Sequence, residues 1–237
     1  MKNTIKKIKD ELKKADKPEN MINYQQFFKE KLKEPFGLRS SILKEISKAC
    51  YKDIKHLPKI EIFDICDELL ETDIRYRRFF AFEWAGKQNK TFEKSDFARF
   101  ERWLTEYVDN WGSCDSLCIG VTGHLIAKFP ELSSKTKKWA KSSNLWQRRA
   151  SAVSLIQPVK KRLLLDEIFK TADILLMDDQ DMVQKGYGWM LKVAGDYYPD
   201  EVFAYVMKHK DKMPRTALRY AIEKYPAHKR KEAMGKS

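Results

Sequence analysis

The sequence predicts an all-α fold built from helical repeats, and three observations carry this prediction. Apolar residues recur at helical spacing, as in Ile60, Phe63 and Leu70, and strand-like alternation is absent. The 9 Gly and 8 Pro residues are too few for a turn-rich β-protein. Short segments that combine a basic residue with small or aromatic neighbours return every 34 to 39 residues, which fits one helix pair per repeat. We therefore expect an α-solenoid of about six helix pairs over residues 1–237, folded as a single domain.

Each recurring segment has one charged residue at the same position within its repeat, and we call this the phased position. Asp115 is the exception among them, because it is a carboxylate where the other repeats carry a cation. Alternate helices of a solenoid line one face, and a small rotation per repeat makes that face concave. The phase thus predicts a basic concave groove, with chemistry at Asp115. The phased positions are Arg39, Arg78, Asp115, Arg149, Lys185 and Arg219.

Start and stop signals divide the chain into helices. Pro35 and Pro158 end the helices before them, since the residue before proline avoids the α region. Pro199 and Pro214 suit the first turn of a helix. The predicted N-terminal caps are Thr72 or Asp73, Ser95, Ser113, Asn144 and the segment 179–181. The predicted helices cover residues 4–14, 21–32, 39–52, 58–71, 74–85, 95–108, 113–129, 133–140, 145–157, 163–175, 181–196, 199–208 and 214–224.

The charge distribution predicts a polyanionic partner. The net charge is +13, with 16 basic against 8 acidic residues in 1–60 and 10 against 4 in 201–237. Basic ends of this kind suit a polyanion held at both flanks, although lysines that simply face water remain an alternative. No run of 18 apolar residues and no signal-peptide pattern is present, so we expect no membrane partner and a cytoplasmic, nucleoid-associated protein.

The cysteines and histidines predict neither a metal site nor a disulfide. Cys50, Cys66, Cys114 and Cys118 lack the CxxC spacing, and the last two are too far apart on a helix for a relaxed disulfide. We expect reduced, buried thiols. The four histidines are scattered, and no Gly-rich phosphate loop or Gly-x-Ser-x-Gly segment occurs, so no metal or cofactor is expected.

Trp111 and Asp115 are four residues apart and therefore share a face of a helix. An indole ring attracts a cation by about 0.5–2 kcal/mol, and a carboxylate adds Coulomb attraction. Trp189, four residues after Lys185, offers a second indole. These residues predict a site for a positively charged group. Three alternatives stay open: Asp115 satisfies backbone N–H groups at a helix start, the two tryptophans are core aromatics, and Arg149 is a salt-bridge partner between repeats.

Three segments in order carry a resemblance to a known family. They read Trp-x-Ser-x-Asp-Ser at 111–116, Asn-x-Trp-x-x-Arg-Ala at 144–150 and Gln-Lys-x-x-Gly-Trp-x-Leu at 184–191. Weaker matches lie at 214–221 and at 21–24 with 36–38. The chain resembles the AlkD-type DNA alkylation-repair glycosylases over nearly its whole length. It departs from them at Asn110 and Gly112, where members often carry Trp and Asp.

The resemblance implies a C-shaped, HEAT-like repeat glycosylase that removes positively charged N-alkylated purines, such as 3-methyladenine and 7-methylguanine, from duplex DNA without flipping the base. It implies that Asp115 is the catalytic carboxylate and that Trp111 and Trp189 contact the sugar and backbone of the lesion nucleotide. A monomer without cofactor is expected. No lysine is placed as a Schiff-base nucleophile, so strand cleavage is not expected. The residues expected to bind DNA are Arg149, which would hold a phosphate, and Lys185, Arg219, Arg78 and Tyr24.

Two other classes of function share parts of this pattern. A non-catalytic protein that binds damaged or branched DNA would keep the basic groove and would not need Asp115. A solenoid that binds protein would have a mixed or acidic groove and a weak dependence on salt.

Overall fold

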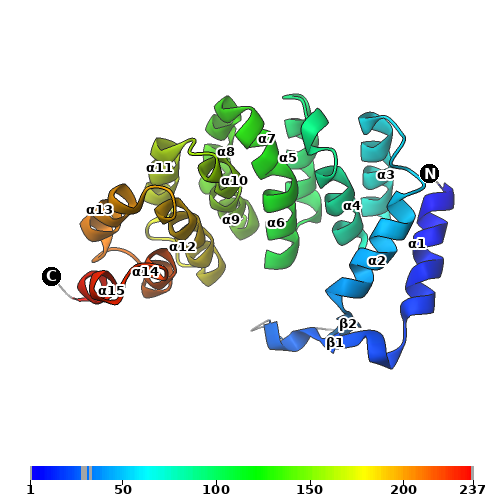
Figure 1. Ribbon diagram of the computed structural model, residues 1–237, viewed down its shortest axis with the longest axis horizontal. Helices are drawn as coiled ribbons and strands as arrows, with labels where there is room; N and C mark the ends of the chain where they lie inside the picture. Colours follow the sequence, from blue (N-terminus) through cyan, green and yellow to red (C-terminus); the bar gives the residue numbers. More distant parts are fainter. Residues whose placement is uncertain (1, 28–30, 32–33, 236–237) are drawn as a thin grey trace. The chain divides into compact units, whose positions relative to one another are not determined.

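The computed structural model describes residues 2–27, 31 and 34–235. The chain divides into two compact units, residues 1–85 and 86–237. Each is built almost entirely of helices, so the predicted all-α solenoid class is confirmed (Figure 1). The single-domain organisation, the C-shape and the concave groove stay predictions.

The described residues of the first unit form four α-helices and a small hairpin. Its buried centre includes an unusual polar contact, in which Trp84 Nε1 donates a hydrogen bond of 2.9 Å to Ser47 Oγ. Buried indole N–H groups need such a partner. The helices are α1 (Lys2–Ala15), α2 (Ser40–Tyr51), α3 (Lys59–Glu71) and α4 (Arg77–Gly86).

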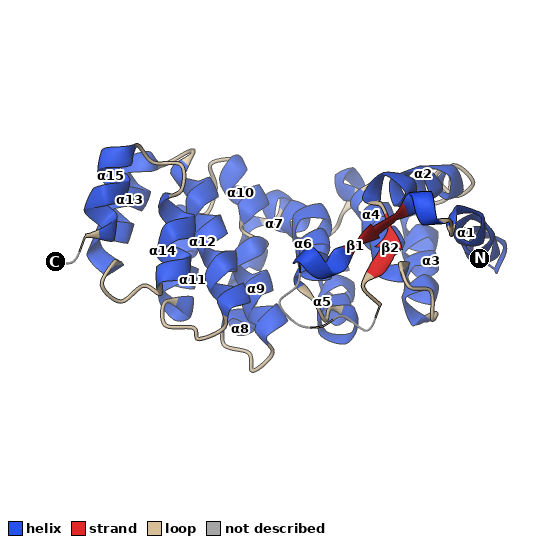
Figure 2. Cartoon of the chain, turned by 90° about the horizontal axis from the view of Figure 1, so that it is seen from below, coloured by secondary structure: helices blue, strands red, loops and turns tan. Residues whose placement is uncertain are grey.

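The segment after α1 is not the predicted helix over 21–32. Strand β1 (Met21–Asn23) pairs antiparallel with β2 (Phe36–Leu38), and a 3₁₀ turn (Tyr24–Phe27) follows β1. Figure 2 shows the two strands side by side. The reason is a set of long-range bonds that outweigh local propensity: Tyr24 N donates to Pro35 O at 2.6 Å, and the Tyr24 hydroxyl donates to Leu38 O at 2.8 Å. The rest of the predicted helix, at 28–30 and 32–33, lies outside the described residues.

The second unit holds two alternating sets of helices. One set packs side by side: α6 (Trp111–Leu117) and α9 (Leu145–Val153), then α9 and α12 (Asp181–Gly195), then α12 and α14 (Arg215–Ile222). We call these the inner helices. A π-helical turn (Cys118–Thr122) continues α6 into α7 (Gly123–Lys128), and α10 (Ile156–Lys160) follows α9 and packs on α7. The remaining helices are α5 (Asp96–Tyr107), α8 (Ser133–Ala140), α11 (Leu165–Leu175), α13 (Pro199–His209) and α15 (Ala227–Met234).

Hydrogen bonds join neighbouring helices at a sequence separation slightly below the predicted 34 to 39 residues. Thr122 Oγ1 and Ser154 Oγ lie 2.9 Å apart, and the Tyr205 hydroxyl donates to Asp173 at 2.7 Å; in both pairs the residues are 32 apart in sequence. A contact that returns after one repeat is what stacked helix pairs produce. The six phased positions accordingly fall at or in α2, α4, α6, α9, α12 and α14, which alternate along the chain with the other helices.

The close approach of α12 and α14 depends on one glycine. A Cβ on Gly188 would lie 2.8 Å from Ala217 O and 2.7 Å from Tyr220 Cβ. A larger side chain would separate the two helices, and this glycine belongs to the Gln-Lys-x-x-Gly-Trp segment.

Several predicted helix ends are corrected. Ser113 is not a cap: the Asn110 side chain accepts from Ser113 N at 2.9 Å, so α6 begins at Trp111. The helix predicted over 145–157 ends at Val153 and resumes as α10, which contains Pro158; proline has no N–H to donate to Ser154 O, so the ladder is interrupted.

Four smaller differences complete the comparison. Helix α4 begins at Arg77, later than predicted, and α15 was not predicted. Ser95 precedes α5 and Gln180 precedes α12, and neither side chain caps its helix. The caps predicted at Ser95 and at 179–181 are therefore wrong. The Asn144 cap is confirmed, with its side chain accepting from Trp146 N at 2.8 Å.

The described residues contain four free, buried cysteines, as predicted. Within the same part of the chain, no helix combines the length and apolar character needed to cross a membrane. No group of three or more His, Cys, Asp or Glu side chains there is arranged to hold a metal ion.

Candidate functional site

An ion pair between Asp115 and Arg149 joins two neighbouring inner helices. Arg149 Nε donates to Asp115 Oδ1 and Nη2 donates to Oδ2, both at 2.8 Å. The Arg149 side chain is 6% exposed and the Asp115 side chain 19% exposed. Two parallel bonds fix the plane of the carboxylate as well as its position. The site thus presents one oriented carboxylate with part of its surface open to solvent.

Arg149 also reaches a third inner helix. Its Nη1 donates a short hydrogen bond to the backbone oxygen of Met182 in α12. A Cβ on Gly186 would lie 3.1 Å from Arg149 Cγ, so this glycine makes room for the side chain. Burial disfavours the charged guanidinium, but the hydrogen bonds and charge of Asp115 more than offset it and raise the Arg149 pKa above its ordinary value. The arginine therefore remains charged.

Local capping places the two partners. Asn110 and Asn144 cap α6 and α9, and both helices consequently start at defined residues. Asp115 lies one turn into α6, and Arg149 lies one turn into α9. The thiol of Cys114, beside Asp115, contacts Trp146 O at 3.5 Å, which brings the starts of the two helices together.

Two further polar contacts, beyond the ion pair along the chain, hold the segment that follows α6 against α9 and α10. Cys118 Sγ contacts Ala150 O at 3.9 Å. Gln157 Nε2 donates to Ile119 O at 3.1 Å, which satisfies a carbonyl of the π-helical turn. Buried groups paired in this way resist sliding, because a shift of either helix would leave them unsatisfied.

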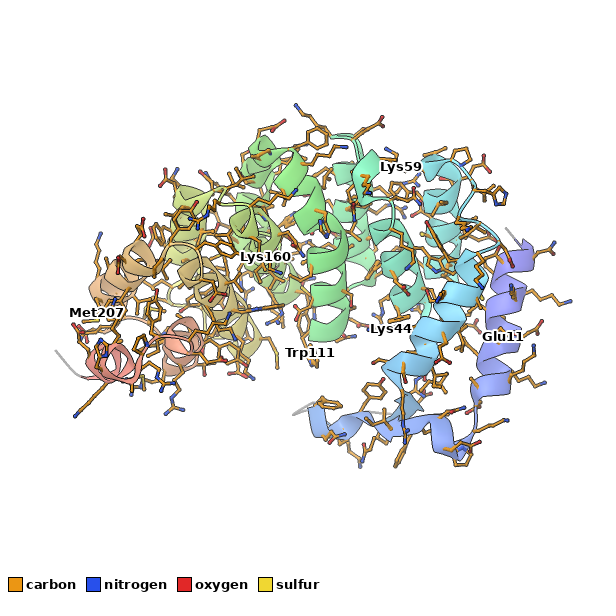
Figure 3. All side chains as sticks on the ribbon, viewed as in Figure 1. Glu11, Lys44, Lys59, Trp111, Lys160 and Met207 are labelled. Carbon is orange, nitrogen blue, oxygen red and sulfur yellow. The ribbon has the colours of Figure 1, made fainter. Side chains whose placement is uncertain are left out.

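The six tryptophans divide into two groups. Trp84, Trp103 and Trp139 are buried in the core. Trp111, Trp146 and Trp189 are only half-buried, and all three lie on inner helices of the second unit. Figure 3 labels Trp111, at the N-terminal end of α6. The alternative of fully buried core aromatics therefore does not describe Trp111 or Trp189.

Trp146 was not among the predicted site residues. It lies in the first turn of α9, three residues before Arg149, and is half-buried like Trp111. The signal that could have found it is its place in the Asn-x-Trp-x-x-Arg-Ala segment, at helical spacing from Arg149.

The predicted cation Lys185 has an acidic partner. Its Nζ lies 2.9 Å from Asp181 Oδ2, one turn earlier on α12, and Thr216 of α14 also contacts Asp181 at 3.4 Å. Asp181 is a second carboxylate on the inner helices that we did not single out from the sequence, although its i, i+4 spacing to Lys185 was readable. Arg219 is exposed on α14.

The structure assigns Arg149 to the salt bridge between repeats, one of the alternatives left open by the sequence. Its donors face Asp115 and Met182 O, which makes it a poor candidate to hold a phosphate. Asn110 caps α6, and Asp115 is the fifth residue of this helix. Asp115 is therefore not the residue that caps the N-terminal backbone N–H groups of α6. The pairing of the two phased positions, 34 residues apart, was not predicted.

The other two predicted residues belong to the first unit. The Tyr24 hydroxyl is bonded to Leu38 O within the hairpin, and Tyr76 braces the same residue by accepting from Leu38 N at 2.8 Å. Arg78 is half-buried in α4. Their role in binding DNA stays a prediction.

The sequence matches the family described as DNA alkylation repair enzyme over residues 8–225. The chain belongs to this family. The family predicted from the sequence motifs is thus confirmed, and membership makes DNA the partner of this repair enzyme. No curated protein matches the sequence.

Two solved structures are similar to this chain. One is a predicted DNA alkylation repair enzyme from Enterococcus faecalis, with a TM-score of 0.71 and 18% identity over 81% of this chain and 87% of the other. The second is smu.31 from Streptococcus mutans UA159, with a TM-score of 0.58 and 21% identity over 77% of this chain and 92% of the other. At these identities the likeness shows a shared fold.

Proposed function

We propose that this DNA alkylation repair enzyme is a monofunctional DNA glycosylase that excises positively charged N-alkylated purines from duplex DNA. The observation that carries the proposal is the partly exposed carboxylate of Asp115, held in a fixed orientation by Arg149. It lies on the same helix as Trp111, at a spacing of one turn. A rigid anion beside an indole is suited to stabilise a cation.

The reaction that this site suits begins with a base that is already a good leaving group. Alkylation of a ring nitrogen gives the purine a positive charge, and the glycosidic bond breaks with its electron pair moving to the base, which leaves neutral. The sugar then carries positive charge at its anomeric carbon. Asp115 stabilises that charge and orients a water molecule, whose oxygen bonds to the anomeric carbon and whose proton is released to solvent.

Electrostatic stabilisation by a single oriented group contributes about 3–4 kcal/mol to catalysis. The ion pair with Arg149 serves this role because the carboxylate does not have to reorient as charge develops. Trp111 and Trp189 supply ring faces toward the sugar and the backbone of the lesion nucleotide, which favours the cationic state over the neutral one.

The charge mechanism predicts the substrate class. 3-Methyladenine and 7-methylguanine carry a formal positive charge, whereas hypoxanthine and ethenoadenine are neutral. We propose that the enzyme senses charge without flipping the base and leaves the DNA strand intact. Lys185 and Arg219 contact phosphates, and the protein acts as a monomer without cofactor.

The test is to incubate the protein with duplex DNA that contains 7-methylguanine and to measure the released base. Free 7-methylguanine together with an alkali-labile but otherwise intact strand supports the proposal. Tight, salt-dependent DNA binding without base release would instead identify a non-catalytic DNA-binding protein.

A further inference from the structure

A cluster of unpaired basic groups lies on α7 and at the end of α10, the helices that follow α6 and α9 along the chain, away from Asp115. Lys160 is the last residue of α10 and Lys161 follows it, and both are exposed. His124, on α7, is half-buried. In the described part of the chain, none of the three side chains forms an ion pair or hydrogen bond. We call these three residues the α7–α10 cluster.

Packing places the three residues together. A Cβ on Gly123 would lie 3.1 Å from Gln157 Cγ, and Gln157 donates to Ile119 O, so the face of α10 that carries Gln157 is turned toward α7. Lys160 and Lys161 follow Gln157 by three and four residues and share that face. His124, next to Gly123, lies on the opposing helix.

The charges around His124 are of one sign. Burial lowers the His124 pKa below its ordinary value, and the charges of Lys161 and Lys160 lower it further. The other charged groups on the packed elements are already engaged: Glu131 pairs with Lys94, and Lys128 donates to backbone oxygens of Lys90 and Phe92. The cluster is thus a concentration of positive charge that lacks an anion.

The backbone keeps these groups exposed. Arg162 and Leu164 adopt positive φ angles of 58° and 64°, so the chain turns sharply after Lys161. Arg162 turns away from the cluster, donating to Tyr197 O at 3.2 Å and contacting the ring of Tyr198. The two lysines are therefore left facing solvent.

The separation from Asp115 suits a backbone phosphate of the same duplex whose lesion lies at Asp115. His124 follows Asp115 by nine residues on one interrupted helix, which corresponds to about 13 Å along the axis. That is comparable to the width of a DNA groove, about 12 Å for the major groove. Figure 3 labels Trp111 and Lys160, which lie at the N-terminal end of α6 and the C-terminal end of α10.

We propose that His124, Lys160 and Lys161 form a phosphate-binding site for the backbone of duplex DNA, separate from the Asp115 site. The proposal rests on the proposed function in taking duplex DNA as the partner, but it requires no base release. A bound phosphodiester supplies the missing anion and favours the protonated form of His124. Binding then takes up a proton.

The first experiment is a fluorescence titration of an undamaged, labelled duplex at several salt concentrations. Lys160→Ala/Lys161→Ala is compared with Lys208→Ala/Lys212→Ala, a pair of exposed lysines on or after α13. We expect the first variant to bind about tenfold more weakly and to lower the salt slope by about one to two units, and the control to stay close to the parent. Equal losses in both variants would overturn the proposal.

The second experiment follows duplex affinity from about pH 8 to about pH 5.5. The free-state pKa of His124 is lowered and bound phosphate raises it, so affinity should increase as the pH falls through the window between the two values. His124→Gln should lose this increase, whereas His209→Gln should retain it. An unchanged pH response in His124→Gln contradicts the proposal.

The source of the phosphate is distinguished by adding tripolyphosphate to the same titration. A DNA backbone site predicts that the parent prefers duplex over tripolyphosphate at equal phosphate concentration, because the duplex also reaches other cations. If tripolyphosphate displaces the duplex at lower phosphate concentration, the cluster is a site for small anions and the proposal fails. Because the DNA is undamaged, these outcomes are independent of glycosylase activity.

Discussion

Replacing Asp115 with asparagine separates the chemical role of the carboxylate from its structural role. Asparagine keeps the shape and one oxygen acceptor for Arg149, and it removes the negative charge. The Arg149 side chain, which is 6% exposed, is then left without a charged partner. Breaking a buried ion pair from one side costs about 3–5 kcal/mol of folding stability, and each kcal/mol lowers Tm by about 2–4 °C in a chain of this size.

The chain offers a matched control one residue away from Arg149. Arg148 Nε donates to Asp178 at 2.6 Å, with the arginine side chain 16% exposed and the carboxylate 7% exposed. Asp178→Asn therefore breaks an arginine–aspartate pair of similar burial. We expect comparable losses of Tm in Asp178→Asn and Asp115→Asn, which thermal unfolding measures.

Base release should distinguish the two variants. Single-turnover excision of 7-methylguanine is measured well below both Tm values, with protein in excess of DNA. Loss of about 3–4 kcal/mol of transition-state stabilisation lowers the rate by two to three orders of magnitude in Asp115→Asn. Asp178→Asn should stay near the parent rate. Equal rates in parent and Asp115→Asn, or equal losses in both variants, would refute the catalytic assignment.

Three further predictions concern the residues around this pair. Arg149→Lys should lower the excision rate at least tenfold and leave the fold intact, because an ammonium group cannot hold the carboxylate by two parallel bonds; single-turnover kinetics and circular dichroism check this. Asp181→Asn should tighten binding of undamaged duplex, because it frees Lys185 from its 2.9 Å partner; a titration that shows no gain would count against Lys185 as a phosphate ligand. Gly188→Ala should destabilise the protein by about 1–3 kcal/mol through overpacking, whereas Gly120→Ala, whose Cβ meets nothing within 4 Å, should be neutral or stabilising in thermal unfolding.

Much of the fold was predictable because its signals are periodic. The spacing of basic segments assigned the phased positions to alternate helices, and the limits of α8 were predicted to the residue. A repeat protein makes mostly contacts between neighbouring repeats, so local patterns determine most of its helices. The segment from Met21 to Leu38 was not predictable in this way. Its hairpin depends on Tyr76, 38 residues away from Leu38, and no local pattern records that contact.

The sequence predicted which residues form the candidate site, but it did not predict that Asp115 and Arg149 pair with each other. The repeat positions singled out Asp115 and Arg149, but they left open whether Arg149 binds a phosphate or forms a salt bridge between repeats, and they did not identify Asp115 as its partner. The structure shows instead that the basic position of one repeat neutralises the acidic position of the preceding one. Which of two partners an arginine takes depends on helix separation and side-chain reach, and neither is encoded in spacing. The same limit applies to Lys185 and Asp181, whose pairing leaves fewer free cations than the sequence implies.

The orientation of Asp115 depends on three successive inner helices. Arg149 holds the carboxylate from α9 and is itself held by Met182 O of α12, whose approach requires the small side chain of Gly186. A lysine at position 149 could supply the charge but not the two parallel bonds. In the proposed reaction, a carboxylate with freedom to rotate would have to reorganise as positive charge develops on the sugar. Reorganisation of this kind consumes the stabilisation that a fixed anion provides. In the proposed mechanism the repeat architecture therefore contributes to the chemistry: stacking fixes the distances between helices, these distances fix the guanidinium, and the guanidinium fixes the carboxylate before DNA arrives.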